Sequence, residues 1–362
     1  MKNTFKVIGL MSGTSLDGLD MAYVSFSRNE SIHFELLNAE CIPYSKLWKD
    51  KLSNAFYLDE SSLKELDTEY GNWLGNTVLN FIKTNNLEPD LIASHGHTIF
   101  HRPQNGYTLQ IGAGKRIHEI TQTTLINNFR VQDVELGGQG APLVPMGDEI
   151  LFSEYDFCLN LGGFSNISWK QNGIRYACDI GPCNILLNSI CKRLQIEYDK
   201  DGFLAKKGKS IESLLEKWNQ IAFYFLSPPK SLGREWFEQQ FKDDIFNKEY
   251  IEIDLLATAI QHIAFQLNQF INSCISQFNT RKLKYRVLIT GGGANHLFLV
   301  QKLRELSNRN LQFEIPDASL VNFKEAIVFA LLGYLRWQGE NNVLSSVTGS
   351  IRDHCSGDIF NG

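Results

Sequence analysis

A glycine-rich loop between two apolar segments near the start of the chain most constrains its fold. Apolar residues up to Leu10 lead into the loop SGTSLDGLD at 12–20, and residues 22–26 leave it with alternating apolar character. Apolar runs that flank a glycine-rich loop predict a β-hairpin. Such a loop can surround an anion with backbone N–H groups and hydroxyls, and its aspartates can face a metal or a water. A simple tight turn, with glycines needed only for positive φ, explains the same residues.

The length and composition are those of a globular protein with two domains. The chain has 362 residues, of which 43% are hydrophobic and 21% charged. A net charge of −5 argues against a general nucleic-acid binder. No apolar stretch approaches the ~18 residues of a membrane span. The seven cysteines form no CxxC pair and the N-terminus shows no signal-peptide pattern, so a cytoplasmic location is expected, without membrane or nucleic-acid partners.

Strand and helix patterns follow one another along the rest of the chain. Residues 32–39 predict a third strand, and residues 89–97 predict a buried strand that ends in polar side chains. Strands followed by helices, with polar residues at the strand ends, indicate the α/β class. Apolar residues at helical spacing predict helices over 46–86, 185–194, 254–278, 297–306 and 324–337.

Two further glycine loops also follow apolar strands, at 162–166 and at 291–295. A bound nucleotide best explains three such loops, with the first two at its phosphates and the third beneath the nucleoside, where glycine permits close approach. Three unrelated turns are the alternative. No loop is a P-loop, because GxxxxGK[ST] does not occur, and the first lacks the GxGxxG of a dinucleotide-binding fold.

Four charged residues are candidates for chemistry, and each has a structural alternative. Asp179 precedes a Gly-Pro entry into a helix, where it is either a general base or an N-cap. The start of that helix would favour an anion or a polar substrate. Arg130 and Asp133 are suited to a structural ion pair. Glu325 stands at the predicted start of a helix, where the helix dipole alone can explain it.

Three histidines form the pattern HxHxxxH at residues 95, 97 and 101. His95 and His97 are predicted to face the same side of a strand. Such a pair can contribute to a zinc site, which would need further ligands. The alternative is that one ring lines a polar cleft and the others form local hydrogen bonds.

The opening segment 8–18 resembles the signature of anhydro-N-acetylmuramic acid kinases. The similarity extends over nearly the whole chain, and three positions depart from the family pattern: Cys183 replaces a small residue, His97 replaces glutamine, and Ala113 stands in a loop where an aspartate is expected. The further matches, in order, are 94–103, 128–133, 137–145, 160–167, 179–184, 199–202, 228–231, 291–295 and 346–349.

The resemblance implies an actin/hexokinase-type fold, in which two RNase H-like α/β domains flank a cleft for ATP and substrate. The N-terminal domain is then expected over residues 1–130, with the tail 345–362 packed on it. The C-terminal domain is expected over 131–344. The family also implies a homodimer.

The implied activity belongs to peptidoglycan recycling. ATP phosphorylates the 6-oxygen of 1,6-anhydro-N-acetylmuramic acid while water opens the anhydro ring. Asp179 matches the family's catalytic aspartate, which deprotonates that water. Glu325 matches a residue that contacts the sugar, Arg130 is a partner for Glu325 or for the lactyl carboxylate, and Asp133 is assigned to the substrate with them.

The resemblance also implies the cofactor contacts. Asp17 is the candidate ligand for Mg²⁺. The residues assigned to ATP are Gly13, Thr14, Ser15, Leu16, Asp17, Gly18, Leu19, Asp20, Gly162, Gly163, Gly291, Gly292 and Gly293.

Two other functions remain open from the sequence. The first is a kinase of the same fold that acts on another sugar or on a carboxylate. The second is a non-catalytic, nucleotide-dependent binding protein. A panel of acceptors separates the first from the family activity, and stimulated phosphotransfer would exclude the second.

Overall fold

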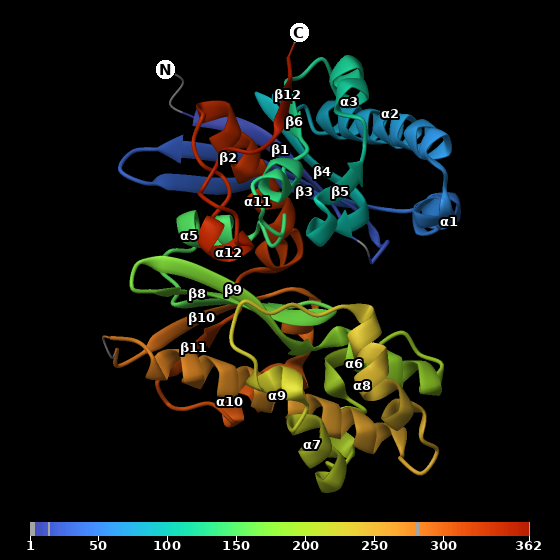
Figure 1. Cartoon of the computed structure of the whole chain (residues 1–362), viewed down its shortest axis with the longest axis vertical. Coiled ribbons are helices and arrows are strands. Elements are labelled where there is room, and N and C mark those ends of the chain that lie inside the picture. The colour runs from blue at the N-terminus through green and yellow to red at the C-terminus, as the bar shows by residue number, and fades with distance from the viewer. Residues whose placement is uncertain (1–3, 14, 280–281, 362) are drawn as a thin grey trace. The chain divides into compact units, whose positions relative to one another are not determined.

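The computed structural model describes residues 4–13, 15–279 and 282–361, and the chain divides into two compact units (Figure 1). The first unit comprises residues 1–153 and 323–362, and the second comprises 154–322. This division differs from the predicted one, because residues 131–153 and 323–344 pack with the first unit. The segment 137–145, one of the family matches, therefore lies within the first unit.

The first unit is built on a seven-stranded sheet in the described part of the chain. Its strand order is β12-β6-β4-β1-β2-β3, with β5 paired to β4. The predicted hairpin is confirmed, since β1 and β2 pair antiparallel from Thr4 opposite Ser27 to Ser12 opposite Leu19. Strand β3 continues the antiparallel pairing, whereas β4 runs parallel to β1 and β6 parallel to β4. The strands are β1 (Thr4–Ser12), β2 (Gly18–Arg28), β3 (Ile32–Pro43), β4 (Leu91–Arg102), β5 (Tyr107–Ile111), β6 (Leu125–Asn127) and β12 (Asp358–Phe360).

Helices cover both faces of this sheet. On one face, apolar residues of α1, α2 and α3 form a core with alternate residues of β1 and β2. On the other face lies α11, which approaches β1 so closely that a Cβ on Gly9 would overlap the carbonyl oxygen of Ala326. The helices and short 3-10 turns are α1 (Lys46–Asn54), η1 (Ala55–Tyr57), α2 (Glu60–Thr84), η2 (Pro103–Asn105), α3 (Gly114–Thr121), α4 (Val131–Glu135), α5 (Pro145–Ile150), α11 (Ala318–Gln338) and α12 (Ser345–Thr348).

Helix α11 is the one helix in the described residues that could cross a membrane by length and composition. Of its apolar window, 67% is buried within the structure. The helix begins at Ala318, six residues before the predicted start at 324. Its small residues fit the sheet, because Gly333 lies against Ala93 of β4.

The second unit is built on a five-stranded sheet in the order β11-β10-β7-β8-β9. Strands β7, β8 and β9 pair antiparallel, and β10 and β11 add parallel strands on the other side of β7. Alternate residues of these strands pack on helices that include α6, α9 and α10. The strands are β7 (Phe157–Leu161), β8 (Phe164–Gln171), β9 (Ile174–Pro182), β10 (Tyr285–Thr290) and β11 (Leu311–Glu314). The helices are α6 (Asn184–Cys191), η3 (Lys192–Leu194), η4 (Lys200–Gly202), η5 (Ala205–Lys207), α7 (Glu212–Asn219), η6 (Ala222–Phe225), α8 (Arg234–Phe246), α9 (Glu252–Ser276), η7 (Gly292–Asn295) and α10 (Leu297–Glu305).

The two units repeat one architecture. In each, three consecutive antiparallel strands are followed by two strands that extend the sheet in parallel beyond the first. This order is that of an RNase H-like domain, and it confirms the predicted class of two α/β domains. In each unit a glycine-containing loop also joins the first two strands.

Candidate active site

The loop of the first hairpin presents Gly13, Ser15 and Asp17 at the end of β1. The N–H of Leu16 donates to the carbonyl of Gly13 over 3.2 Å, and Leu16 has a left-handed φ of 60°. Ser15 and Asp17 are exposed, as a loop that receives a ligand requires. Thr14, also predicted to contact the nucleotide, lies outside the described residues.

The second half of the predicted loop belongs to strand β2. Leu19 is 1% exposed and packs in the core, so it is an interior residue rather than a nucleotide contact. Gly18 is required by close packing, because a Cβ there would lie 2.5 Å from the carbonyl oxygen of Ile42. Asp20 is half-buried and its carboxyl pairs with the thiol of Cys41; burial raises the pKa of Asp20.

A chain of buried hydroxyl groups fixes the entry into this loop. The Oγ atom of Ser12 lies 2.8 Å from Nδ1 of His97 and 2.6 Å from the hydroxyl oxygen of Tyr44. That oxygen is in turn 2.5 Å from the hydroxyl of Tyr70 in α2. Burial lowers the pKa of His97 to about 4, so its ring is neutral near pH 7. His97 is therefore a hydrogen-bonding support for the loop.

A bulge in β4 separates His95 from His97. The register passes from Leu10 opposite Ser94 to Ser12 opposite His97, and Gly96 between the two histidines has φ +73°. The prediction that both rings face the same side is therefore wrong. His95 packs against Phe329 of α11, on the face opposite α2.

The histidines are also unsuited to a shared metal site. The described residues include no group of three or more His, Cys, Asp and Glu side chains that could hold a metal ion. His101, the third histidine of the pattern, forms a local contact, since its Nδ1 lies 3.1 Å from Oγ1 of Thr108.

Arg130 is held in place by His95 and by the glycine loop at 137–140. Its Nε donates to Nε2 of His95 over 2.9 Å, and a terminal nitrogen donates to the carbonyl of Gly140 over 2.6 Å. Nε2 of His95 therefore accepts, and its Nδ1 carries the proton that faces the carbonyl of Gly96 at 3.0 Å. Burial lowers the pKa of Arg130 to about 10, which leaves the guanidinium charged near neutral pH.

Glu325 lies two turns inside α11, so the dipole at the helix start cannot explain it, because that effect fades within the first turn. The side chain is open to solvent, yet burial raises its pKa. A carboxyl group that faces water on one side and packed protein on the other is both open to solvent and raised in pKa by burial. The charge of Arg130 lowers the pKa of Glu325, while the carboxylate of Asp20 raises it. Both groups therefore lie close enough to act on Glu325, as the predicted partnership with Arg130 requires.

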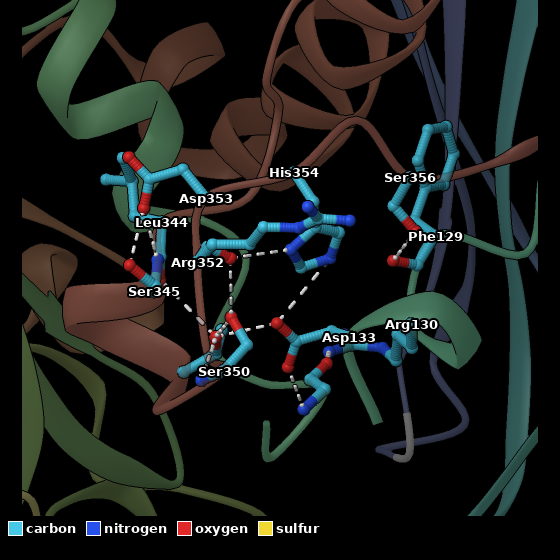
Figure 2. A network of polar contacts seen from close by, with 12 residues as sticks. Phe129, Arg130, Asp133, Leu344, Ser345, Ser350, Arg352, Asp353, His354 and Ser356 are labelled. Carbon is cyan, nitrogen blue, oxygen red and sulfur yellow. Dashed lines mark hydrogen bonds and ion pairs between the residues drawn. The ribbon is translucent and has the colours of Figure 1, made fainter. Parts of the chain in front are cut away.

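Asp133 occupies an interior network instead (Figure 2). The residue is 0% exposed, and its two carboxylate oxygens accept from the N–H of Gly140 over 2.6 Å and from the hydroxyl of Thr348 over 2.7 Å. Nε2 of His354 lies 3.6 Å from the carboxylate. Asp133 thus joins the C-terminal tail to the loop that holds Arg130. It is neither the direct ion-pair partner of Arg130 nor placed to touch a sugar.

We expect Asp133→Ala to destabilise the first unit. The change leaves the buried Gly140 N–H without its acceptor and leaves the Thr348 hydroxyl with longer bonds, such as that to the carbonyl of Leu344 at 3.4 Å. An unsatisfied buried group costs about 1–3 kcal/mol. Urea unfolding followed by circular dichroism measures the loss, with the exposed Asp50→Ala as the control. Unchanged stability together with a raised KM for the sugar would instead restore the predicted role in substrate binding.

Asp179 lies within β9 in the second unit. It is not an N-cap, because β9 continues to Pro182 and Cys183 caps α6. Its Oδ2 accepts from the N–H of Leu232 over 2.8 Å, and its own N–H donates to the carbonyl of Lys230. Among the described residues, Oδ1 accepts no hydrogen bond. Burial raises the pKa of Asp179 and the Leu232 N–H opposes this, so the half-buried carboxyl is suited to accept a proton.

The sequence does not predict that Asp179 contacts Lys230 and Leu232. Its only indication for the segment 228–231 is the match to the family pattern. Its approach to β9 depends on tertiary packing, and no residue spacing reports that.

The two glycine loops of the second unit lie side by side. Strands β7 and β10 are parallel neighbours, and Asn160 and Thr290, at the ends from which the loops emerge, pair directly. A Cβ on Gly291 would lie 2.9 Å from the carbonyl carbon of Leu161, and one on Gly293 would lie 2.7 Å from the Leu161 Cβ. Paired loops at the carboxyl ends of parallel strands form a common position for nucleotides in α/β proteins.

The start of α6, by contrast, has no spare amides for an anion in its first residues. The N–H groups of Cys183 and Ile185 donate to the carbonyl of Gly163, and that of Asn184 donates to the carbonyl of Gly162. The prediction that this helix start favours an anion is therefore wrong for these three amides. The 162–163 loop can meet a ligand through Gly163, which is exposed, and a side chain there would meet none of the described residues beyond its chain neighbours within 4 Å of its Cβ.

Comparison with known proteins decides the family. A family model described as anhydro-N-acetylmuramic acid kinase matches residues 5–362. The chain belongs to this family. Proteins named anhydro-N-acetylmuramic acid kinase from Gloeothece citriformis and Microcystis aeruginosa are 33% and 34% identical to it. The alignments cover 97% and 98% of this chain, and 97% and 99% of those proteins.

Two solved structures show weaker likeness, each at 12% identity and over 91% of this chain. One is the Acidaminococcus fermentans (R)-2-hydroxyglutaryl-CoA dehydratase component A, with a TM-score of 0.46 over 98% of that chain. The other is the activator of the 2-hydroxyisocaproyl-CoA dehydratase from Clostridium difficile with bound ADPNP, with a TM-score of 0.42 over 94% of that chain. TM-scores this low support no conclusion about the fold or the function of this chain.

The departures from the anhydro-N-acetylmuramic acid kinase pattern have local explanations. Cys183 is 0% exposed and packs in the core of the second unit, so its thiol does not line a ligand site. Near Ala113, Asp67 of α2 supplies a carboxylate that accepts from the N–H of Gly112 over 2.6 Å. A carboxylate thus stands beside this loop although the loop itself has none.

Proposed function

We propose that the protein uses ATP to phosphorylate 1,6-anhydro-N-acetylmuramic acid and opens its anhydro ring with water, giving ADP and N-acetylmuramic acid 6-phosphate for peptidoglycan recycling. Membership of the family supports the substrate and the reaction. The observation that carries the chemistry is Asp179, a half-buried carboxylate with one oxygen held by a backbone N–H and the other available.

Asp179 acts as the general base in this proposal. Its available oxygen takes a proton from the water that attacks the anomeric carbon. The bond from that carbon to the 6-oxygen breaks, and the 6-oxygen then takes the γ-phosphoryl group while ADP leaves. Positioned general bases contribute typically about 10²–10⁴-fold to the rate.

The charged residues of the first unit bind and orient substrate groups. Arg130, fixed by His95 and Gly140, carries a positive charge suited to the lactyl carboxylate. Glu325, open to solvent beside that charge, accepts hydrogen bonds from the sugar. Both side chains are held by packed elements, which limits their motion during reaction.

The hairpin-loop residues from Gly13 to Asp17 and the paired loops at Gly163 and at 291–293 bind ATP in this proposal. Glycines have no side chain and let a phosphate or a nucleoside approach the backbone. Asp17 fits Mg²⁺, because its carboxylate is exposed and Mg²⁺ is usually bound by one or two carboxylates plus phosphates and waters. The bound ion would neutralise charge on the phosphates.

We expect activity to fall on the acid side of a pKa above the ordinary aspartate value of 3.8, because burial raises the pKa of Asp179. The base works only when ionised, so kcat/KM falls as the pH drops through that raised pKa. The residual activity of Asp179→Asn should lack this acid limb. A wild-type profile that stays flat down to pH 3.8 would contradict the assignment.

The acceptor is tested by ADP release with a panel of compounds. We expect the anhydro sugar to stimulate release strongly, while other sugars and carboxylates do not. Turnover of another acceptor without turnover of the anhydro sugar would favour a different kinase of this fold. Nucleotide binding without stimulated release by any acceptor would favour a binding protein.

We further propose that the protein works as a homodimer in the cytoplasm. The family resemblance supports the dimer. The seven cysteines are all free, which suits a reducing compartment and supports the location. Multi-angle light scattering after size exclusion should give twice the mass of 41.2 kDa, and a single-chain mass would contradict the dimer.

A further inference from the structure

We infer that Lys230 is a positioning residue for Asp179: its ammonium group anchors the segment 228–232, whose backbone holds the aspartate. This inference rests on the proposed function, because it takes Asp179 as the base. Lys230 itself need not touch the substrate.

The backbone of this segment grips Asp179 at two points. The carbonyl of Lys230 accepts from the N–H of Asp179 over 3.1 Å, and the N–H of Leu232 donates to the Asp179 Oδ2 over 2.8 Å. Strand β9 lies at the edge of its sheet, so the segment takes the place of a further strand there. The second bond selects which carboxylate oxygen is occupied and which is left for the reaction.

The segment itself has no regular secondary structure, and residues 226–229 are exposed. Its position therefore depends on side-chain contacts. Lys230 supplies them, because its Nζ donates to the carbonyl of Phe223 over 3.1 Å and lies 4.7 Å from the centre of the Phe223 ring. The same Nζ lies 5.5 Å from the ring centre of Phe270 in α9.

These contacts suit a cation and not an apolar side chain. Aromatic faces attract an ammonium group, more strongly as water is removed. Burial lowers the pKa of Lys230, while the neighbouring thiols of Cys178 and Cys274 raise it. Cys178 precedes Asp179 in β9 and Cys274 lies in α9, so the ammonium group joins the edge strand, the helical core and η6.

Lys230, whose ammonium group anchors the segment, and Leu232, whose N–H binds Asp179, are two residues apart. When the ammonium group is lost, Leu232 is expected to move from Oδ2, since the Lys230 side chain ties this irregular segment to Phe223. A displacement of about 1 Å in a positioning group can cost about 100-fold in rate. The carboxylate also loses a donor that favours its charged form, so its proton affinity rises.

The test compares Lys230→Met with Lys230→Arg in the full-length protein. For Lys230→Met we expect kcat to fall about 10–100-fold, with KM for ATP unchanged and the acid limb of kcat/KM displaced to higher pH. Lys230→Arg keeps the cation and should recover most of the rate and the original acid limb. The control is Lys207→Met, which removes an exposed cation 3.7 Å from the ring centre of Phe203 and should change neither quantity.

A second measurement does not depend on catalysis. In protein labelled with ¹³C at aspartate carboxyls, the Asp179 signal, assigned by its loss in Asp179→Asn, should titrate at higher pH in Lys230→Met than in the wild type. An unmoved titration, or an arginine variant as damaged as the methionine variant, would overturn the inference. Full activity of Asp179→Asn would instead remove Asp179 as the base, while the titration still decides the role of Lys230. If Lys230→Met does not fold, Phe270→Leu should give a smaller shift in the same direction.

Discussion

Asp179→Asn is expected to reduce sugar-dependent ADP release by about 10²–10⁴-fold, the usual contribution of a general base. The amide oxygen can still accept from the Leu232 N–H, so the local geometry should persist while the basicity is lost. Calorimetric titration with ADP should show unchanged binding. The measurement is therefore a comparison of kcat with nucleotide affinity in the same preparation.

The control is Asp243→Asn, an exposed aspartate of α8 in the same unit, which should retain wild-type turnover. Wild-type turnover in Asp179→Asn would remove the base assignment. A joint loss of turnover and ADP binding would show that the variant perturbs more than the proton transfer, and the assignment would then lack its main support.

Gly9→Ala is expected to destabilise the first unit by about 1–3 kcal/mol or more, the range for overpacking a tight interior. A Cβ at this position would overlap backbone atoms of Ala326, and Ala330 also lies close, so the strand and α11 must move apart. Helix α11 carries Glu325, so activity should fall along with stability. Urea unfolding measures the first effect and ADP release the second.

Gly13→Ala is the matched control for stability. Its Cβ would meet only the Ser15 hydroxyl oxygen at 3.6 Å, an ordinary contact, so the unfolding midpoint should change little. Equal stability of Gly9→Ala and the wild type would mean that α11 does not approach β1 as closely as the structure has it.

Much of the fold could be predicted from the sequence where apolar periodicity decides it. The first hairpin, the strand at 32–39 and the long helix α9 follow directly from alternating or helical spacing. The boundaries between units could not be predicted in this way. They depend on α11 packing against the first sheet. That contact requires residues without side chains at Gly9 and Gly333, and no local pattern predicts it.

The candidate site, too, could be predicted from the sequence only in part. The glycine loops and Asp179 were recognisable by composition and by family resemblance. Three assignments failed for tertiary reasons: the bulge at Gly96 turns His95 and His97 to opposite faces, Leu19 enters the core, and Asp133 is enclosed by the tail. Register shifts and long-range hydrogen bonds leave no trace in residue spacing.

In the proposed reaction, one protein both opens the anhydro ring and phosphorylates the oxygen released. Product analysis by mass spectrometry and ³¹P NMR, after incubation with ATP and 1,6-anhydro-N-acetylmuramic acid in H₂¹⁸O, tests this most directly. We expect one ADP for each molecule of N-acetylmuramic acid 6-phosphate, with ¹⁸O at the anomeric carbon at early times. A phosphorylated sugar that keeps its anhydro ring, or ring opening without phosphate transfer, would contradict it.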